Sequence, residues 1–206
     1  MKRPFAMKLD YEPSFIEYRV MSDMPRATDE DRALVAKSAD DIRIEVSVFS
    51  FDVSALDRRV QDGNAAQAFI QAHLYLDHVV SRLLSENVPF PRQLQLDRSG
   101  FSQKLQLVAA LGLLKPGHIA PIKVINSIRN KIAHQLDYAV QASDEAKLRS
   151  TIGKGADREE DGSQTPLVQL LRLLIVLVDL ERQERAFERL MRMRAVANAR
   201  VVLDRF

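Results

Sequence analysis

The sequence predicts a mainly α-helical protein: a four-helix up-down bundle over residues 54–206, preceded by a small N-terminal extension over residues 1–53. Two observations favour this fold class. The 206 residues include only 7 glycines and 8 prolines, which is few for a turn-rich β fold. Several long segments place apolar residues three or four positions apart, the spacing that forms one face of an amphipathic helix. Such helices, joined by modest connections, form a bundle.

Two segments of the extension have strand character. Residues 15–21 are a short candidate strand, and residues 42–48 alternate apolar with polar side chains, which is typical of a half-buried strand. We therefore expect one or two β-strands here; if residues 42–48 are helical instead, the whole chain is α. Between these segments, Thr28 followed by three acidic residues predicts a helix start, and that helix continues to about Ser38.

Four segments supply the predicted bundle helices. They are residues 65–86, 101–114, 119–138 and 166–203. The first has its apolar stripe at Phe69, Ala72, Leu76, Val80 and Leu83. Ser99 is the expected N-cap of the second, and Lys115-Pro116-Gly117 stops it. Shorter helices are expected at residues 54–60 and 143–150, with Ser143 as the cap of the latter, and residues 153–164 read as a polar loop.

The last helix changes character along its length. Its first half is apolar nearly all round and should be buried. Further on, arginines alternate with Glu181, Glu184 and Glu188, which predicts a solvated, salt-bridged face. After Glu188 the balance turns basic, and two interpretations stay open: contact with RNA phosphates or an acidic partner, or simply an exposed helix end.

Composition excludes several function classes. With no cysteine, the chain has no disulfide, thiol nucleophile or cysteine-based zinc site. A net charge of +2 permits nucleic-acid binding without arguing for it, and no glycine-rich phosphate-binding motif occurs. The most apolar run, residues 167–180, is short and contains Arg172 and Asp179, so it is not a membrane span. Without an apolar signal segment, we expect a cytoplasmic protein.

Residues 124–138 carry the most distinctive polar side chains. On a helical wheel, Ile125, Ile128, Ile132 and Leu136 form one apolar stripe. Taking Ile125 as zero, Arg129 falls at about 40°, on the shoulder of that stripe. Asn130 falls at about 140° and His134 at about 180°, on the opposite face.

A second pair of polar residues lies on the first bundle helix. His73 and Asp77 are four residues apart on the shoulder of its core face, where they can meet Arg129. A half-buried arginine needs an anionic partner, and Asp77 is the first choice. His73 and Asp77 alone are too few to hold a metal ion, so we expect neither a metal site nor a cofactor.

The spacing Arg129-Asn130-x-x-x-His134 resembles the R-x(4–6)-H motif of the HEPN superfamily, in which asparagine often follows the arginine. Residues 72–84, A-H-L-Y-L-D-H-V-V-S-R-L-L, resemble the first helix of that superfamily, with Asp77 at a commonly acidic position. Residues 101–113 are similar to helical families around the mannitol operon repressor. The resemblance covers about residues 62–203.

The resemblance implies a metal-independent endoribonuclease, toxin- or defence-like, that acts as a homodimer on RNA. His134 would then be the acid or base, Arg129 the phosphate stabiliser and Asn130 a positioning residue, with His73, Asp77 and Tyr138 in support. An antitoxin or regulatory protein is the other implied partner. Because Arg129 and His134 lie about 140° apart on an ideal helix, either the helix ends near residues 133–135 or a second subunit completes the site.

A non-catalytic interpretation stays open beside this one. Asn130 and His134 can hydrogen-bond each other or cap a helix end, and Arg129 with Asp77 can be a purely structural ion pair. Many HEPN-like proteins are regulators or adaptors that bind protein or nucleic acid without cleaving RNA.

Overall fold

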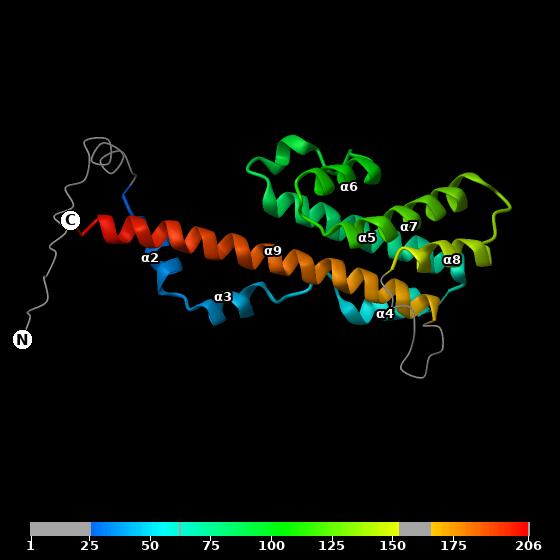
Figure 1. The fold of residues 1–206 in the computed structure, drawn as a ribbon, viewed down its shortest axis with the longest axis horizontal. Coiled ribbons are helices and arrows are strands. Elements are labelled where there is room, and N and C mark those ends of the chain that lie inside the picture. The colour runs from blue at the N-terminus through cyan, green and yellow to red at the C-terminus, as the bar shows by residue number, and fades with distance from the viewer. Residues whose placement is uncertain (1–25, 62, 153–165, 206) are drawn as a thin grey trace, which may run out of the picture. The chain divides into compact units, whose positions relative to one another are not determined.

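The computed structural model describes residues 26–61, 63–152 and 166–205 (Figure 1). Its elements are α2 (Asp29–Ala36), α3 (Ala39–Val46), α4 (Val53–Gln61), α5 (Ala65–Asn87), the 3-10 helix η1 (Pro91–Leu94), α6 (Phe101–Ala110), α7 (Pro116–His134), α8 (Ala142–Ser150) and α9 (Leu167–Leu203). No strand occurs within these ranges, which confirms the mainly α fold class. The candidate strand at residues 15–21 lies outside the described residues.

Contacts group the chain into two compact units. One holds the described residues up to Ile42 together with those from Leu190 onward, and the other is Arg43–Arg189. This grouping differs from the predicted boundary at residue 53, because the end of α9 belongs with the N-terminal segment.

In the smaller unit, α2 is tied to the end of α9. The Thr28 hydroxyl accepts a hydrogen bond from the Asp31 N–H at 3.0 Å, which caps α2 where the sequence predicts. Arg32 pairs with Asp204 at 3.1 Å, and Arg200 pairs with Asp31 at 3.4 Å. Arg200, one of the basic residues at the end of α9, is therefore engaged within the chain.

The predicted strand at residues 42–48 is wrong, because Ala39–Val46 form α3. Ser38 and Asp41 form a reciprocal cap: the Asp41 N–H donates to the Ser38 hydroxyl at 3.0 Å, and the Ser38 N–H donates to the Asp41 carboxylate at 2.9 Å. A strand would place Ile42 and Ile44 on one face, yet Ile42 is buried and Ile44 is 73% exposed. Local capping thus overrides the alternating pattern.

The larger unit is built around α5, which contacts α4, α6 and α7. Asn64 caps α5 in a reciprocal pair with Gln67, and all five residues of its predicted apolar stripe are buried. The same core includes residues of α9, namely Leu170, Leu171, Leu174, Ile175 and Val178. It also includes Leu56 of α4, Val108 of α6, Ile125 of α7 and Leu148 of α8.

The connection between α6 and α7 is tighter than the sequence suggests. α6 ends at Ala110 rather than at residue 114, because Gly112 adopts the left-handed conformation (φ +63°). The Leu113 N–H then bonds to the Val108 carbonyl at 3.0 Å, and the Gly112 N–H bonds to the Ala109 carbonyl at 3.1 Å. These two bonds form a Schellman motif, which turns the chain into α7 at Pro116.

The predicted solvated, salt-bridged face on the middle of α9 is confirmed only in part. Glu184 and Glu188 are exposed, and Arg185 pairs with Glu188 at 3.1 Å. Glu181 and Arg182 are buried instead, as is Asp179 on the preceding turn. Asp179 accepts hydrogen bonds from Ser50 Oγ at 2.6 Å and from Arg182 Nε at 2.9 Å. Burial raises the pKa of Asp179, but these bonds outweigh it and hold the pKa below its usual value. Arg182 also donates to the Val48 carbonyl at 2.7 Å, so the segment between α3 and α4 is fastened to α9.

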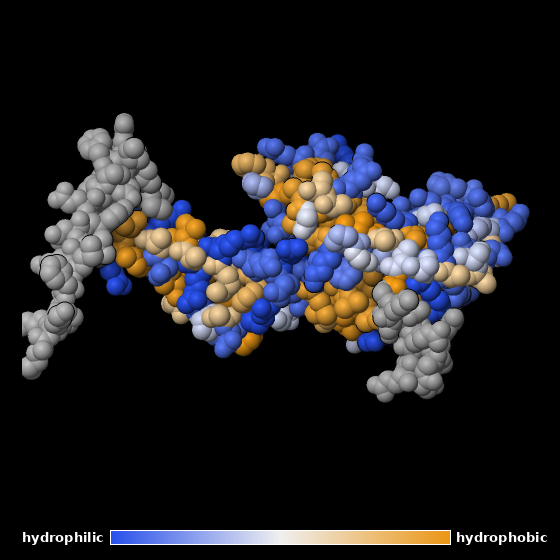
Figure 2. Space-filling view, in the orientation of Figure 1, coloured by the Kyte–Doolittle hydropathy of each residue, from blue (hydrophilic) through white to orange (hydrophobic). Residues whose placement is uncertain are grey.

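Some apolar side chains of α9 remain at the surface. Leu173 and Leu180 are 37% and 44% exposed, and Figure 2 shows apolar surface among polar side chains along this helix. In the ranges described, none of the helices combines the length and apolar character needed to span a membrane.

Candidate functional site

The motif residues gather at the C-terminal end of α7. The helix ends at His134, and Gln135 is its C-cap, with an N–H that bonds to the Lys131 carbonyl at 2.9 Å. The sequence predicts either a helix end near residues 133–135 or a site completed by a second subunit, and the structure has the helix end. Leu136 therefore lies beyond the helix, where it is 100% exposed, so its assignment to the apolar stripe is wrong.

The exposure of the three motif residues follows the wheel. Arg129 is half-buried, whereas Asn130 and His134 are exposed. Arg129 Nη1 donates to Asn130 Oδ1 at 3.3 Å. Within the described ranges, His134 makes no side-chain hydrogen bond or ion pair, so its imidazole is open to solvent or to a partner.

The predicted pair between Arg129 and Asp77 is wrong. Asp77 instead binds Lys104 of α6 at 2.8 Å, and the same ammonium donates to Ser81 Oγ at 3.0 Å. Lys104 is only 6% exposed. The signal was present in the sequence: Lys104 lies one turn before the buried Val108, so helical spacing places it on the apolar face, where it needs a carboxylate.

His73 lies beside the motif without bonding to it. Its Nε2 donates to Asn126 Oδ1 at 3.1 Å, and its ring stacks at a tilt 4.5 Å from that of Phe101. Burial, and next the nearby Arg129 cation, hold the pKa of His73 below its usual value. Its Nδ1 is buried and hydrogen-bonds to none of the residues that the structure describes. His73 is thus a neutral core-edge histidine that Arg129 influences through space.

The third supporting residue, Tyr138, belongs to a polar cluster that the sequence analysis missed. Its hydroxyl donates to Asp144 of α8, and Lys131 of α7 binds the same carboxylate at 2.9 Å. The Gln141 N–H also donates to Asp144 at 3.1 Å, so Gln141, not Ser143, is the N-cap of α8. The cluster fastens residues 135–141, which follow His134, to α8.

The charges of this cluster reinforce one another. Burial raises the pKa of Asp144, but the bonds from Tyr138, Lys131 and Gln141 outweigh it and leave the pKa below its usual value. Burial and the bond to Asp144 raise the pKa of Tyr138. The bond to Asp144 raises the pKa of Lys131. Asp144 is therefore the anion that holds both neighbours in place.

The arrangement offers phosphate chemistry more readily than metal chemistry. A guanidinium and an accessible imidazole lie on one helix end, the former suited to phosphate oxygens and the latter to proton transfer. Among the described residues, no group of three or more histidine, aspartate or glutamate side chains is placed to hold a metal ion.

Comparison of the chain with protein-family models, with curated proteins and with solved structures finds no match. The HEPN resemblance therefore stays a prediction that the motif residues and their place in the sequence carry.

Proposed function

We propose that the protein is a metal-independent endoribonuclease of HEPN type, acting as a homodimer, with α5, α6, α7 and α9 as the four helices of an up-down bundle. One observation carries this proposal. Arg129 and His134 share the surface-facing end of α7, and neither is engaged in an ion pair with a described residue. Arg129 does not form the structural ion pair expected with Asp77, because Asp77 pairs with Lys104.

In the proposed reaction, His134 accepts the proton of an RNA 2′-hydroxyl. The 2′-oxygen attacks the neighbouring phosphorus, and the bond from phosphorus to the 5′-oxygen of the next nucleotide breaks. The products are a 2′,3′-cyclic phosphate and a leaving 5′-oxygen, which takes up a proton from water and becomes a 5′-hydroxyl, while His134 releases to solvent the proton that it accepted. Arg129 donates to the phosphate oxygens on which negative charge grows, and Asn130, its hydrogen-bond partner, positions the guanidinium.

A dimer suits this chemistry because one α7 alone points Arg129 and His134 in different directions, about 140° apart on an ideal helix. Two motifs facing each other supply an arginine from one subunit and a histidine from the other. Leu136, fully exposed two residues after His134, offers an apolar contact for the second subunit. A toxin- or defence-like role fits such an activity.

The test is cleavage of labelled RNA by the purified full chain in the presence of EDTA. We expect a product with a 2′,3′-cyclic phosphate, and loss of cleavage in Arg129→Ala and in His134→Ala while thermal unfolding is unchanged. Lys123→Ala, which alters an exposed cation on the same helix, is the matched control and should retain activity. Cleavage that persists in His134→Ala, or that stops with EDTA, counts against the proposal.

The alternative function is a non-catalytic regulator or adaptor that binds protein or nucleic acid. It is favoured by the His134 imidazole itself, since no described residue hydrogen-bonds to it, whereas catalytic histidines are usually oriented by such a bond. This alternative predicts intact RNA and a stable complex with a partner. Multiple turnover by the wild-type chain, lost in His134→Ala, excludes it.

A further inference from the structure

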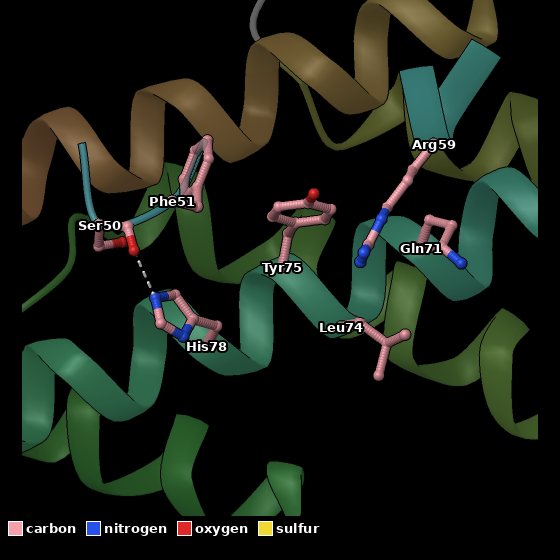
Figure 3. A pocket seen from close by; sticks show the side chains of 7 residues that line it. All are labelled: Ser50, Phe51, Arg59, Gln71, Leu74, Tyr75 and His78. Atoms are coloured by element: carbon pink, nitrogen blue, oxygen red, sulfur yellow. Dashed lines mark hydrogen bonds between the residues drawn. The ribbon is translucent and has the colours of Figure 1, made fainter. Parts of the chain in front are cut away.

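A pocket of about 320 Å³ lies on the face of α5 that meets α4 and the segment before α4. Its lining consists of Ser50, Phe51, Arg59, Gln71, Leu74, Tyr75 and His78 (Figure 3). We propose that this pocket binds a small aromatic anion, a carboxylate or a phosphate, whose ring carries an N–H or O–H donor. The proposal is independent of the proposed ribonuclease activity, because no motif residue lines the pocket.

Charge selects an anion. Arg59 is exposed, forms no hydrogen bond or ion pair with any described residue, and has no carboxylate beside it in the lining. Arg172, by contrast, is paired, because it donates two hydrogen bonds to the carboxylate of Asp57 in α4. A free guanidinium with five N–H donors binds a carboxylate or phosphate through two parallel hydrogen bonds.

Aromatic side chains select a planar ring. The rings of Tyr75 and Phe51 meet edge to face at 5.3 Å, and Leu74 beside them is 53% exposed. Figure 3 shows Tyr75 in the middle of the lining, between Phe51 on one side and Arg59 with Gln71 on the other. A ring on Tyr75 therefore places a carboxylate or phosphate within reach of Arg59.

Gln71 provides the third element of recognition. Its Oε1 is buried and hydrogen-bonds to no described residue, which is a costly state for an amide oxygen. When the Gln71 amide turns into the pocket that it lines, this oxygen can accept from a ligand N–H or O–H beside the anionic group. Tyr75 thus contacts the ring of the ligand, Arg59 binds its anionic group, and Gln71 accepts from its N–H or O–H donor.

The wall of the pocket opposite Arg59 is preformed. His78 Nε2 donates to the Ser50 carbonyl at 2.8 Å, the dashed line in Figure 3. The Ser50 hydroxyl donates in turn to the buried Asp179 at 2.6 Å. Because these bonds hold the wall before any ligand arrives, binding does not require the segment to become ordered.

The test is a fluorescence titration of the full chain with indole-3-acetate, which combines ring, carboxylate and N–H donor. The chain has no tryptophan and 4 tyrosines, so exciting the indole at a wavelength that tyrosine does not absorb removes the background from the protein. We expect saturable binding that weakens by about tenfold or more in Arg59→Gln, the loss of a charged hydrogen bond. Arg58→Gln removes the neighbouring exposed cation, which does not line the pocket, and should bind as wild type.

Related probes separate the elements of recognition. Naphthalene-1-acetate lacks the N–H and should bind more weakly, and indole-3-acetamide lacks the charge and should not compete. Indol-3-yl phosphate beside indole-3-acetate tells whether phosphate or carboxylate fits better. Leu74→Glu places a carboxylate at the mouth of the pocket and should abolish binding of either anion.

Three results overturn the proposal: no saturable binding of either indole anion, wild-type affinity in Arg59→Gln, or equal losses in Arg58→Gln and Arg59→Gln. His134→Ala should bind indole-3-acetate as wild type. Failure of the ribonuclease assay therefore leaves this test unaffected.

Discussion

Lys104 of α6 and Asp77 of α5 form an ion pair of 2.8 Å in which the lysine, not the aspartate, is the buried partner. The lysine side chain is 7% exposed and the aspartate side chain 35% exposed. Because Asp77 pairs with Lys104, Arg129 of α7 lacks the carboxylate that would otherwise neutralise it. Arg129 is left half-buried with Asn130 as its hydrogen-bond partner.

The asymmetric burial predicts unequal effects of the two substitutions. Asp77→Asn leaves a buried ammonium without its counter-charge and should lower the free energy of unfolding by about 2 kcal/mol. Lys104→Met keeps the apolar stem and leaves an aspartate that water can reach, so the loss should be smaller. Urea unfolding measures both, with the exposed Asp97→Asn as control. A larger loss in Lys104→Met contradicts this account.

His73 predicts a pH dependence of stability. Burial and the Arg129 cation lower its pKa in the folded protein, so between that pKa and the unfolded value of 6.5 the unfolded chain binds more protons. Stability should therefore be greatest above pH 6.5 and fall on acidification, with a slope of up to about 1.4 kcal/mol per pH unit.

The measurement is urea unfolding at several pH values for wild type and His73→Gln, which removes the titrating ring. The difference between their free energies of unfolding should change with pH below 6.5 and be constant above it. His134→Gln, which alters an exposed histidine, is the control and should follow the wild-type profile. A His73→Gln curve parallel to wild type at all pH values would refute the assignment.

The buried carboxylate of α9 predicts a larger effect than a surface one on the same helix. Asp179 is 0% exposed and pairs with Arg182, so Asp179→Asn should cost about 3 kcal/mol, because it leaves the buried guanidinium with Glu86, at 3.2 Å, as its remaining counter-charge. Glu184→Gln breaks an exposed pair with Arg43 and should cost about 1 kcal/mol or less. Thermal and urea unfolding compare the two; similar losses would mean that the network of Asp179 is not a stability determinant.

Elements with strong local signals were predictable from the sequence. The bounds of α5 and its buried stripe follow from helical spacing. At the motif, the wheel angles correctly separate the half-buried Arg129 from the exposed Asn130 and His134. These features depend on residues within two turns of one another, which is the range over which periodicity carries information.

What escaped prediction depends on partners far apart in the chain. The burial of Asp179 and Arg182 needs the segment at Val48–Ser50, more than a hundred residues away. Helix periodicity gives the side on which a charge lies, but not whether a distant loop covers that side. The misassigned strand at residues 42–48 has the opposite cause, since the local cap at Ser38 outweighs an alternation that two isoleucines and two valines create.

The Tyr138–Asp144 bond predicts how firmly the segment after His134 is held. Tyr138→Phe removes the hydroxyl that donates to Asp144 but keeps the ring beside Lys131. We expect a destabilisation of about 1 kcal/mol and faster hydrogen exchange of the amides in residues 135–141. If the motif is catalytic, RNA cleavage should fall because His134 is less firmly positioned, while binding of indole-3-acetate is unchanged. Asp137→Asn, an exposed substitution in the same segment, should change none of these.

Unaltered exchange in Tyr138→Phe would show that Lys131 and Gln141 hold Asp144 without the tyrosine, and the segment would then owe its order to α7 and α8 alone.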